Sequence, residues 1–467
     1  MSRCLHILVC ALVITALILP PGPATAFGEF GIKDEAELGE KFKILMQAQF
    51  PLIKDPYVLH FVEDILDRVE QVMPPQPFSL QVNVLLDSFI NAFAAPAGYV
   101  FVNSGLILSM DREDEVAAVI AHELAHVTER HLAQHIQQSQ MISIGTLVGV
   151  LAGALLGGGG SALGQALAVG SLAGGQAAAL KFSRDDEREA DQLGLRFLTQ
   201  AGYEPEAMMR TFERMLKKKR LSGSSTPPAY MLTHPGLNER VGSIQDLAQH
   251  FQAQSPLAQQ DPEVFARVKM LLSTKYAPNP EQSSVVGQAD QDLDCLQLLG
   301  KAMALARLNR MGQAERSLQK ALACNGDHPL WLREAGWFAF QSGEYRKAKK
   351  FLDQALNRDQ NDYLARYYRA RVLAETGSRT RAVEDLRRVL KSVPEDGQVH
   401  RTLGRIIGQS GDHFLGYLHL AYSKMYAHDL EEADRYMQQA RDLAQTPVQK
   451  EKVQKLKEEC SRRKEIL

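Results

Sequence analysis

Two histidines four residues apart in this sequence have the spacing of a metal site. Residues 119–131 read VIAHELAHVTERH, with Glu123 between His122 and His126. On an α-helix, residues i and i+4 lie on one face, so the two imidazoles project side by side. Such a pair can hold one zinc ion, and Glu123 beside it can act as a general base. Because the triplet also arises by chance, it predicts a hydrolytic site only if the chain supplies a third ligand elsewhere.

A charged segment further along the chain offers that ligand. Glu187 and Asp191 are again four apart within SRDDEREADQLGLRF, which predicts a helix. One carboxylate can bind the metal while the other accepts a hydrogen bond from the far nitrogen of a ligand histidine. A solvated acidic face is an equal alternative, because Asp185, Asp186 and Glu189 are close by.

The helix that carries the histidine pair is expected to begin near residues 111–114 and to continue to about Gln138. On one continuous helix, His131 and His135 lie about 140° and 180° from His126. We therefore expect both to be surface histidines.

The segments before this helix predict further helices and a small sheet. Residues 34–72 have a helical pattern with a break at Pro51 and Pro56, and residues 80–88 predict a strand. Residues 90–107, with Pro and Gly beside YVFV, predict an edge strand and a turn.

The segment after the helix changes composition sharply. Residues 141–180 contain no charged side chain and are rich in Gly and Ala. The apolar run is short for a membrane span, so a buried helix pair is the simpler interpretation. A lid or a surface that contacts lipid is the alternative. Beyond Glu187 we expect a further helix to about Leu221, then a loop, then a helix from about Leu237.

Bulk properties limit the classes of function. A chain of 467 residues is long enough for two or three domains, and its net charge of −2 gives no basic field for nucleic acid. Residues 1–26 combine Arg3, a short apolar run and Ala-Thr-Ala, which is typical of a cleaved signal peptide; a membrane anchor is the alternative. In an exported, oxidising compartment, Cys295 and Cys324 are the pair expected to form a disulfide.

The C-terminal part repeats itself every 34 residues, which is the period of tetratricopeptide helix pairs. A linker is expected at residues 276–290, followed by an α-solenoid over residues 291–467. A partial fourth copy covers residues 404–421, and Ala433 lies out of register in a last pair. The matching positions are Ala314, Leu318 and Ala321; Ala348, Leu352 and Ala355; and Ala382, Leu386 and Val389.

Four motifs in order resemble the M48 family of zinc metallopeptidases: NAFAAPAGYVFVNSGLI, HELAH, SRDDEREAD and THPGLNER, all within residues 90–241. The resemblance implies a mainly α, α+β gluzincin-type domain with a small sheet over residues 27–275. It implies one zinc ion held by His122, His126 and Glu187. Glu123 would be the catalytic base, and Asp191 the acidic residue one turn after the third ligand.

The same resemblance implies a substrate cleft and two further residues. The edge segment lining the cleft matches Asn91, Ala92, Phe93 and Ala94, and Arg240 would position substrate or its own loop. Ala97 departs from the family, where many relatives have a second glycine. His234, in the sequence THP, could stabilise an oxyanion, bind the metal as a fourth ligand that makes the enzyme latent, or be an ordinary loop histidine.

A signal peptide before this domain and repeats after it resemble members of the family that support outer-membrane β-barrel assembly. That implies a periplasmic zinc endopeptidase that degrades misfolded or stalled envelope proteins, with repeats that bind the client or the β-barrel assembly machinery. The alternatives are a chaperone-like assembly factor whose peptidase is rarely used and a purely structural repeat protein. Contact of residues 141–180 with a membrane stays open, and no nucleic-acid partner is expected.

Overall fold

A computed structural model describes residues 30–138, 182–221, 229–251 and 261–467. The expected signal peptide and the uncharged segment at residues 141–180 lie outside these ranges. No helix within the described ranges is long and apolar enough to cross a membrane.

The chain begins with two helices, α2 (Ile32–Gln49) and α3 (Pro56–Glu70). Asp55 caps α3 by accepting a hydrogen bond from the Tyr57 N–H at 3.0 Å, and Pro56 occupies the first helical position, where its missing N–H costs nothing. The break expected between the two helices is therefore confirmed.

A three-stranded sheet follows, built from β1 (Gln81–Leu85), β2 (Ala92–Ala95) and β3 (Tyr99–Asn103) in the order β1-β3-β2. β3 runs parallel to β1 and antiparallel to β2, so β3 is central and β2 is an edge strand. The turn between β2 and β3 puts Ala97 at φ 64° and Gly98 at φ 78°. The position where the sequence lacks the second glycine thus has a left-handed backbone that disfavours alanine.

The helix of the histidine pair is shorter than expected. α4 (Ser104–Ser109) leads to α5 (Glu113–Thr128), which is followed by a separate helix α6 (His131–Gln138). Arg130, between α5 and α6, has φ 53°, a conformation that no α-helix can continue through. The prediction of one helix to residue 138 is wrong, and angles counted along it do not hold beyond Thr128.

The remaining helices of the N-terminal part are α10 (Arg184–Gln200), α11 (Glu206–Leu221), α12 (Ala229–Thr233), α13 (Leu237–Ala248) and α14 (Pro262–Thr274). Ser183 and Asp186 form a capping box that fixes the start of α10. α10 packs closely on α5: a Cβ added at Gly194 would lie 3.0 Å from the His122 Cα. The expected loop before Leu237 contains the short helix α12.

Ten helices of the C-terminal part form five successive antiparallel pairs. One short 3-10 helix, Pro280–Gln282, lies in the expected linker, and a second, Asp290–Asp292, begins at its last residue. Cys295 and Cys324 form the predicted disulfide with a Cα–Cα distance of 5.7 Å. The repeat positions identified in the sequence are all buried. The helices are α15 (Cys295–Arg307), α16 (Met311–Asn325), α17 (Pro329–Gln341), α18 (Tyr345–Arg358), α19 (Tyr363–Glu375), α20 (Arg379–Ser392), α21 (Gly397–Gln409), α22 (His413–Tyr426), α23 (Leu430–Leu443) and α24 (Pro447–Ile466).

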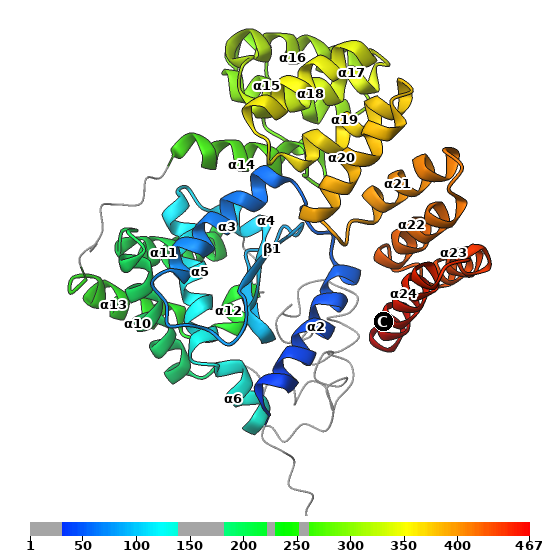
Figure 1. Cartoon of the computed structure of the whole chain (residues 1–467). Coiled ribbons are helices and arrows are strands. Elements are labelled where there is room, and N and C mark those ends of the chain that lie inside the picture. Colours follow the sequence, from blue (N-terminus) through cyan, green and yellow to red (C-terminus); the bar gives the residue numbers. More distant parts are fainter. Residues whose placement is uncertain (1–29, 139–181, 222–228, 252–260) are drawn as a thin grey trace, which may run out of the picture.

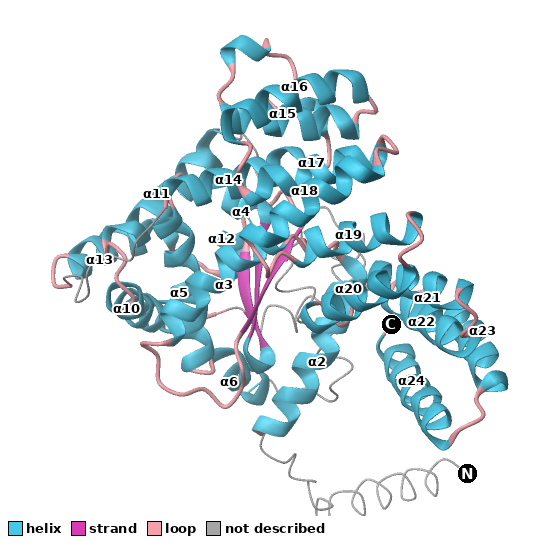
Figure 2. Ribbon diagram, turned by 45° about the horizontal axis from the view of Figure 1, so that its top comes forward, coloured by secondary structure: helices cyan, strands magenta, loops and turns pink. Residues whose placement is uncertain are grey.

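The repeats curve around the N-terminal part, so that α24 comes to lie beside α2 (Figure 1). The small sheet lies inside the N-terminal part, surrounded by its helices (Figure 2). One hydrophobic cluster contains Phe61 and Phe265 of the N-terminal part together with Leu299, Trp331 and Phe338 of the repeats. The core is therefore continuous across the expected linker.

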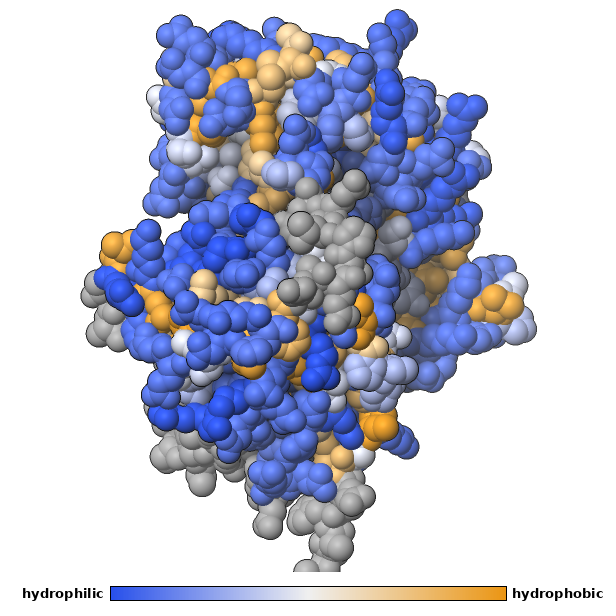
Figure 3. All heavy atoms as spheres, turned by 90° about the vertical axis from the view of Figure 1, so that its left-hand side faces the viewer, coloured by the Kyte–Doolittle hydropathy of each residue, from blue (hydrophilic) through white to orange (hydrophobic). Residues whose placement is uncertain are grey.

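On the side of the molecule that carries α10, α11 and α13, polar and charged side chains predominate, and hydrophobic side chains form separate small clusters (Figure 3). The end of α11 is basic, with Lys218, Lys219 and Arg220 in its last turn.

Candidate metal centre

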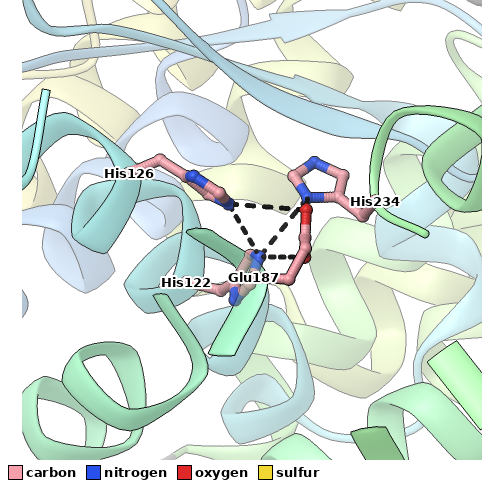
Figure 4. A group of neighbouring side chains, drawn as sticks. All are labelled: His122, His126, Glu187 and His234. Carbon is pink, nitrogen blue, oxygen red and sulfur yellow. Dashed lines mark hydrogen bonds and ion pairs between the residues drawn. The ribbon is translucent and has the colours of Figure 1, made fainter. Parts of the chain in front are cut away.

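Three segments bring four ligand-type side chains to one point. His122 and His126 come from α5, Glu187 from the first turn of α10, and His234 from the residue after α12. One ligand atom from each lies within 4.8 Å of the other three, and all four side chains are buried (Figure 4). Glu187 thus points at the histidine pair and does not belong to a solvated acidic face.

The individual distances show which atoms converge. The Nε2 atoms of His122 and His126 are 3.1 Å apart, and the Glu187 carboxylate lies 3.5 Å from the first and 3.9 Å from the second. His234 Nδ1 lies 2.9 Å from Glu187 Oε1 and 3.4 Å from His122 Nε2. His234 therefore lies beside the other three, at the position expected of a fourth ligand.

Two further charged residues, Asp191 and Arg240, contact the side chains of this cluster. The Nδ1 atom of His122 is 3.2 Å from Asp191 Oδ1, and Arg240 donates to both Asp191 oxygens at 2.6 and 2.7 Å. Arg240 also forms an ion pair with Glu187. The sequence predicted that Arg240 positions substrate or its own loop. In the structure, Arg240 forms ion pairs with Asp191 and Glu187.

Glu123 lies at the border between the cluster and the sheet edge. Its Oε2 atom accepts a hydrogen bond of 3.0 Å from the Ala94 N–H of β2, and its Oε1 atom is 3.4 Å from His234 Nε2. Asn91, Ala92 and Phe93 are buried along the same strand and the residue before it. The expected cleft-lining segment is therefore adjacent to the candidate base.

Burial and neighbouring charges shift the pKa values in this cluster in opposite directions. Burial raises the pKa of Glu123, partly offset by His234 and His122. Burial would also raise the pKa of Glu187, but His234 and Arg240 lower it well below its usual value. Burial would lower the pKa of His122, but hydrogen bonds to Asp191 and Glu187 raise it to about 9. Glu187 is thus ionised at neutral pH, as a metal ligand must be.

The residues present fit a zinc ion. Two imidazoles and one carboxylate are the donor set of many catalytic zinc sites, and Asp191 supplies the hydrogen-bond acceptor that such a histidine ligand requires. Among the described residues, Glu123 Oε1 and His234 Nε2 are buried polar atoms without a hydrogen-bond partner. Convergence of buried, electron-rich atoms is costly unless a cation compensates it.

The prediction of a surface position for His131 is wrong. The residue is 1% exposed, and its Nδ1 atom lies 2.9 Å from His126 Nδ1. The left-handed residue Arg130 changes the direction of the chain, and His131 at the start of α6 lies beside His126, which counting residues along one helix could not reveal. His135 is partly exposed, and its Nε2 atom lies 2.7 Å from Asp186.

Comparison with known proteins identifies two segments of the chain. Residues 53–248 match Peptidase family M48, and residues 339–406 match the tetratricopeptide repeat. Residues 53–248 are thus an M48 peptidase domain. The four ligand-type residues and Glu123 all lie within its matched range.

Several curated proteins resemble the chain. It is 30% identical to the beta-barrel assembly-enhancing protease of Yersinia pestis over 66% of its own length and 63% of that protein. It is 28% identical to the protein of the same name in Escherichia coli K12 over 67% of its length and 64% of that protein. The mitochondrial metalloendopeptidase OMA1 of Schizosaccharomyces pombe is 33% identical over 40% of the chain and 52% of its own length. The chain thus spans less than two thirds of the relatives it matches.

The protein described as MamA 41-end from Desulfovibrio magneticus RS-1 matches 37% of this chain and 94% of its own, at 19% identity and a TM-score of 0.28.

Proposed function

We propose that this chain is an exported zinc-dependent endopeptidase whose metal is held by His122, His126 and Glu187. The observation that carries the proposal is the convergence of these three side chains on one buried point, with Glu123 next to them and hydrogen-bonded to the edge strand β2. A bound zinc ion supplies a Lewis acid that polarises a peptide carbonyl and makes water more acidic.

Glu123 has the position of a general base. Its pKa is raised by burial, so that the carboxylate can accept a proton from the attacking water and return it to the leaving amine. We assign supporting roles to two further residues: Arg240 favours the ionised form of Glu187, and Asp191 orients His122.

Substrate would bind as an extended segment alongside β2. Edge strands recognise peptides through main-chain hydrogen bonds, which depend little on sequence. The Ala94 N–H, which now donates to Glu123, would be one of the donors available to that segment. Asn91, Ala92, Phe93 and Ala94 are thus the proposed substrate-binding residues, and selection would depend on access.

His234 is proposed to restrict that access. Its Nδ1 atom lies among the three ligands, and its ring stacks on Tyr230 at a centroid distance of 4.3 Å. As a fourth protein ligand it would close the position that substrate needs, giving a latent enzyme. His234→Ala should raise basal peptidase activity. A collapse of activity would instead support an oxyanion-stabilising role, and unchanged activity would exclude both.

Envelope proteins are the proposed clients, and periplasm the proposed location. The relatives named as beta-barrel assembly-enhancing proteases and the signal-peptide pattern support this assignment. A cavity of about 760 Å³, lined by Trp337, Tyr367, Arg401 and Lys424 of the repeats and by Lys54 of the N-terminal part, supports a holding role for the repeats. A chaperone-like function independent of hydrolysis is therefore the second candidate.

Two variants test the enzyme and separate it from the second candidate. Glu123→Gln should bind zinc stoichiometrically and fail to cleave an unfolded protein such as casein. Glu129→Gln, at the residue that follows the same helix, should behave as wild type. Glu187→Gln should lose zinc, measured as metal content of the purified protein. Cleavage by Glu123→Gln at the wild-type rate would refute the proposal. If this variant still supports β-barrel assembly in cells, the chaperone-like function independent of hydrolysis is favoured.

A further inference from the structure

The two ligand histidines of the proposed zinc site are supported in different ways. Each uses Nε2 toward the cluster, which leaves Nδ1 to face its own neighbour. For His122 that neighbour is the carboxylate of Asp191 at 3.2 Å. For His126 it is another imidazole, that of His131, at 2.9 Å.

The proton positions along this second contact follow from metal binding. A metal ion takes the lone pair of His126 Nε2, so a neutral His126 carries its proton on Nδ1 and donates it. His131 Nδ1 must then be the acceptor, which leaves the proton of a neutral His131 on Nε2. That atom lies 3.3 Å from Glu189 Oε2, a carboxylate on the outer face of α10. The two hydrogen bonds therefore run in the same direction: His126 donates to His131, and His131 donates to Glu189.

The local structure fixes His131 for this contact. The left-handed Arg130 starts α6, whose first hydrogen bond runs from the Gln134 N–H to the Arg130 carbonyl at 3.0 Å. The His126 ring is stacked on Phe182 at a centroid distance of 3.9 Å, which limits its rotation. One aromatic contact and one hydrogen bond together define the plane in which His126 presents Nε2.

We propose that His131 is a positioning residue of the metal centre, which orients His126 by accepting a hydrogen bond from its Nδ1–H and in turn donates from Nε2 to Glu189. This inference rests on the proposed zinc site. Loss of such an outer partner usually lowers metal affinity by about 10- to 100-fold.

Three variants separate this role from simple packing. His131→Leu fills the buried space without an acceptor, and His131→Asn keeps an acceptor near the Nδ1 position. His135→Leu is the matched control, because His135 lies one turn further along α6 and pairs with Asp186 rather than with His126. Zinc affinity is measured on the full chain by competition with a chromophoric chelator, and folding is checked by circular dichroism.

We expect His131→Leu to bind zinc about 10- to 100-fold more weakly, His131→Asn to recover most of the loss, and His135→Leu to stay within about threefold of wild type. Equal losses in His131→Leu and His131→Asn, or no loss in either, would overturn the inference while leaving the zinc site intact. Wild-type protein that binds no zinc would overturn the proposed function as well.

The tautomers of His126 and His131 can be measured directly in the wild-type protein. Nitrogen-15 spectra of the zinc-loaded protein should show His126 protonated at Nδ1 and His131 protonated at Nε2. A His131 protonated at Nδ1 cannot accept from His126 and would refute the proposal. A role in packing alone would not require either tautomer.

Discussion

The charge cluster that joins the peptidase domain to the repeats should control the stability of both. Arg333, on α17, is fully buried and donates to the two oxygens of Asp55 at 3.0 and 2.9 Å. It also contacts Glu334 at 2.9 Å and Asp362 at 3.3 Å. Lys275 completes the cluster through Glu334 and Asp55.

Replacement of Arg333 by methionine leaves the carboxylates buried with too little positive charge. Burial would raise the pKa of Asp55, but Arg333 and Lys275 lower it to about 2. Loss of one partner from a buried ion pair costs about 3–5 kcal/mol, because the remaining charge is uncompensated. We therefore expect Arg333→Met to lower the free energy of unfolding by about 3–5 kcal/mol.

Both tryptophans of the chain, Trp331 and Trp337, lie on α17. Urea unfolding followed by tryptophan fluorescence therefore reports on the helix that carries Arg333, and circular dichroism reports on the whole chain. Arg358→Met is the matched control, since that arginine is exposed and lies 3.7 Å from Asp327, and exposed pairs contribute about 0–1 kcal/mol. A loss below 1 kcal/mol for Arg333→Met would refute the reasoning. Because the core is continuous, we also expect the two probes to give the same transition.

Three further predictions concern the site and the repeats. Gly194→Ala would push α10 away from the His122 backbone, so zinc affinity in chelator competition should fall, and the free energy of unfolding in urea should fall by about 1–3 kcal/mol. Gly242→Ala, which has open space around it, should leave zinc affinity unchanged and be neutral or stabilising in urea. The disulfide closes a separation of 29 residues, so the Cys295→Ala/Cys324→Ala variant should lose about 3–4 kcal/mol in urea unfolding, and an unchanged midpoint would contradict the bond. In the metal-free protein the pKa of His122 is raised to about 9, so the contribution of this histidine to stability is complete below pH 6.5 and is lost as the pH rises through 9. The urea midpoint of chelator-treated protein should therefore fall between pH 6.5 and 9, and a midpoint that rises would contradict the assignment.

The local elements of the site were predictable because they depend on short-range pattern. The spacing of His122 and His126 needs only helical geometry, and the capping box at Ser183 marks the start of α10 in the sequence itself. The 34-residue period predicted the buried repeat positions for the same reason. The short helix α12 before His234 was missed, since five residues are too few for a periodic signal.

The sequence by itself determined which residues could bind a metal and which helices carry them, because i to i+4 geometry is local. Only the tertiary structure decided that Glu187 faces the histidines and that His234 joins them, because both depend on how α5, α10 and the end of α12 pack. It also decided that His131 is buried, since a single left-handed residue, Arg130, redirects the chain. Residue spacing records neither how distant helices pack nor where a single left-handed residue ends a helix.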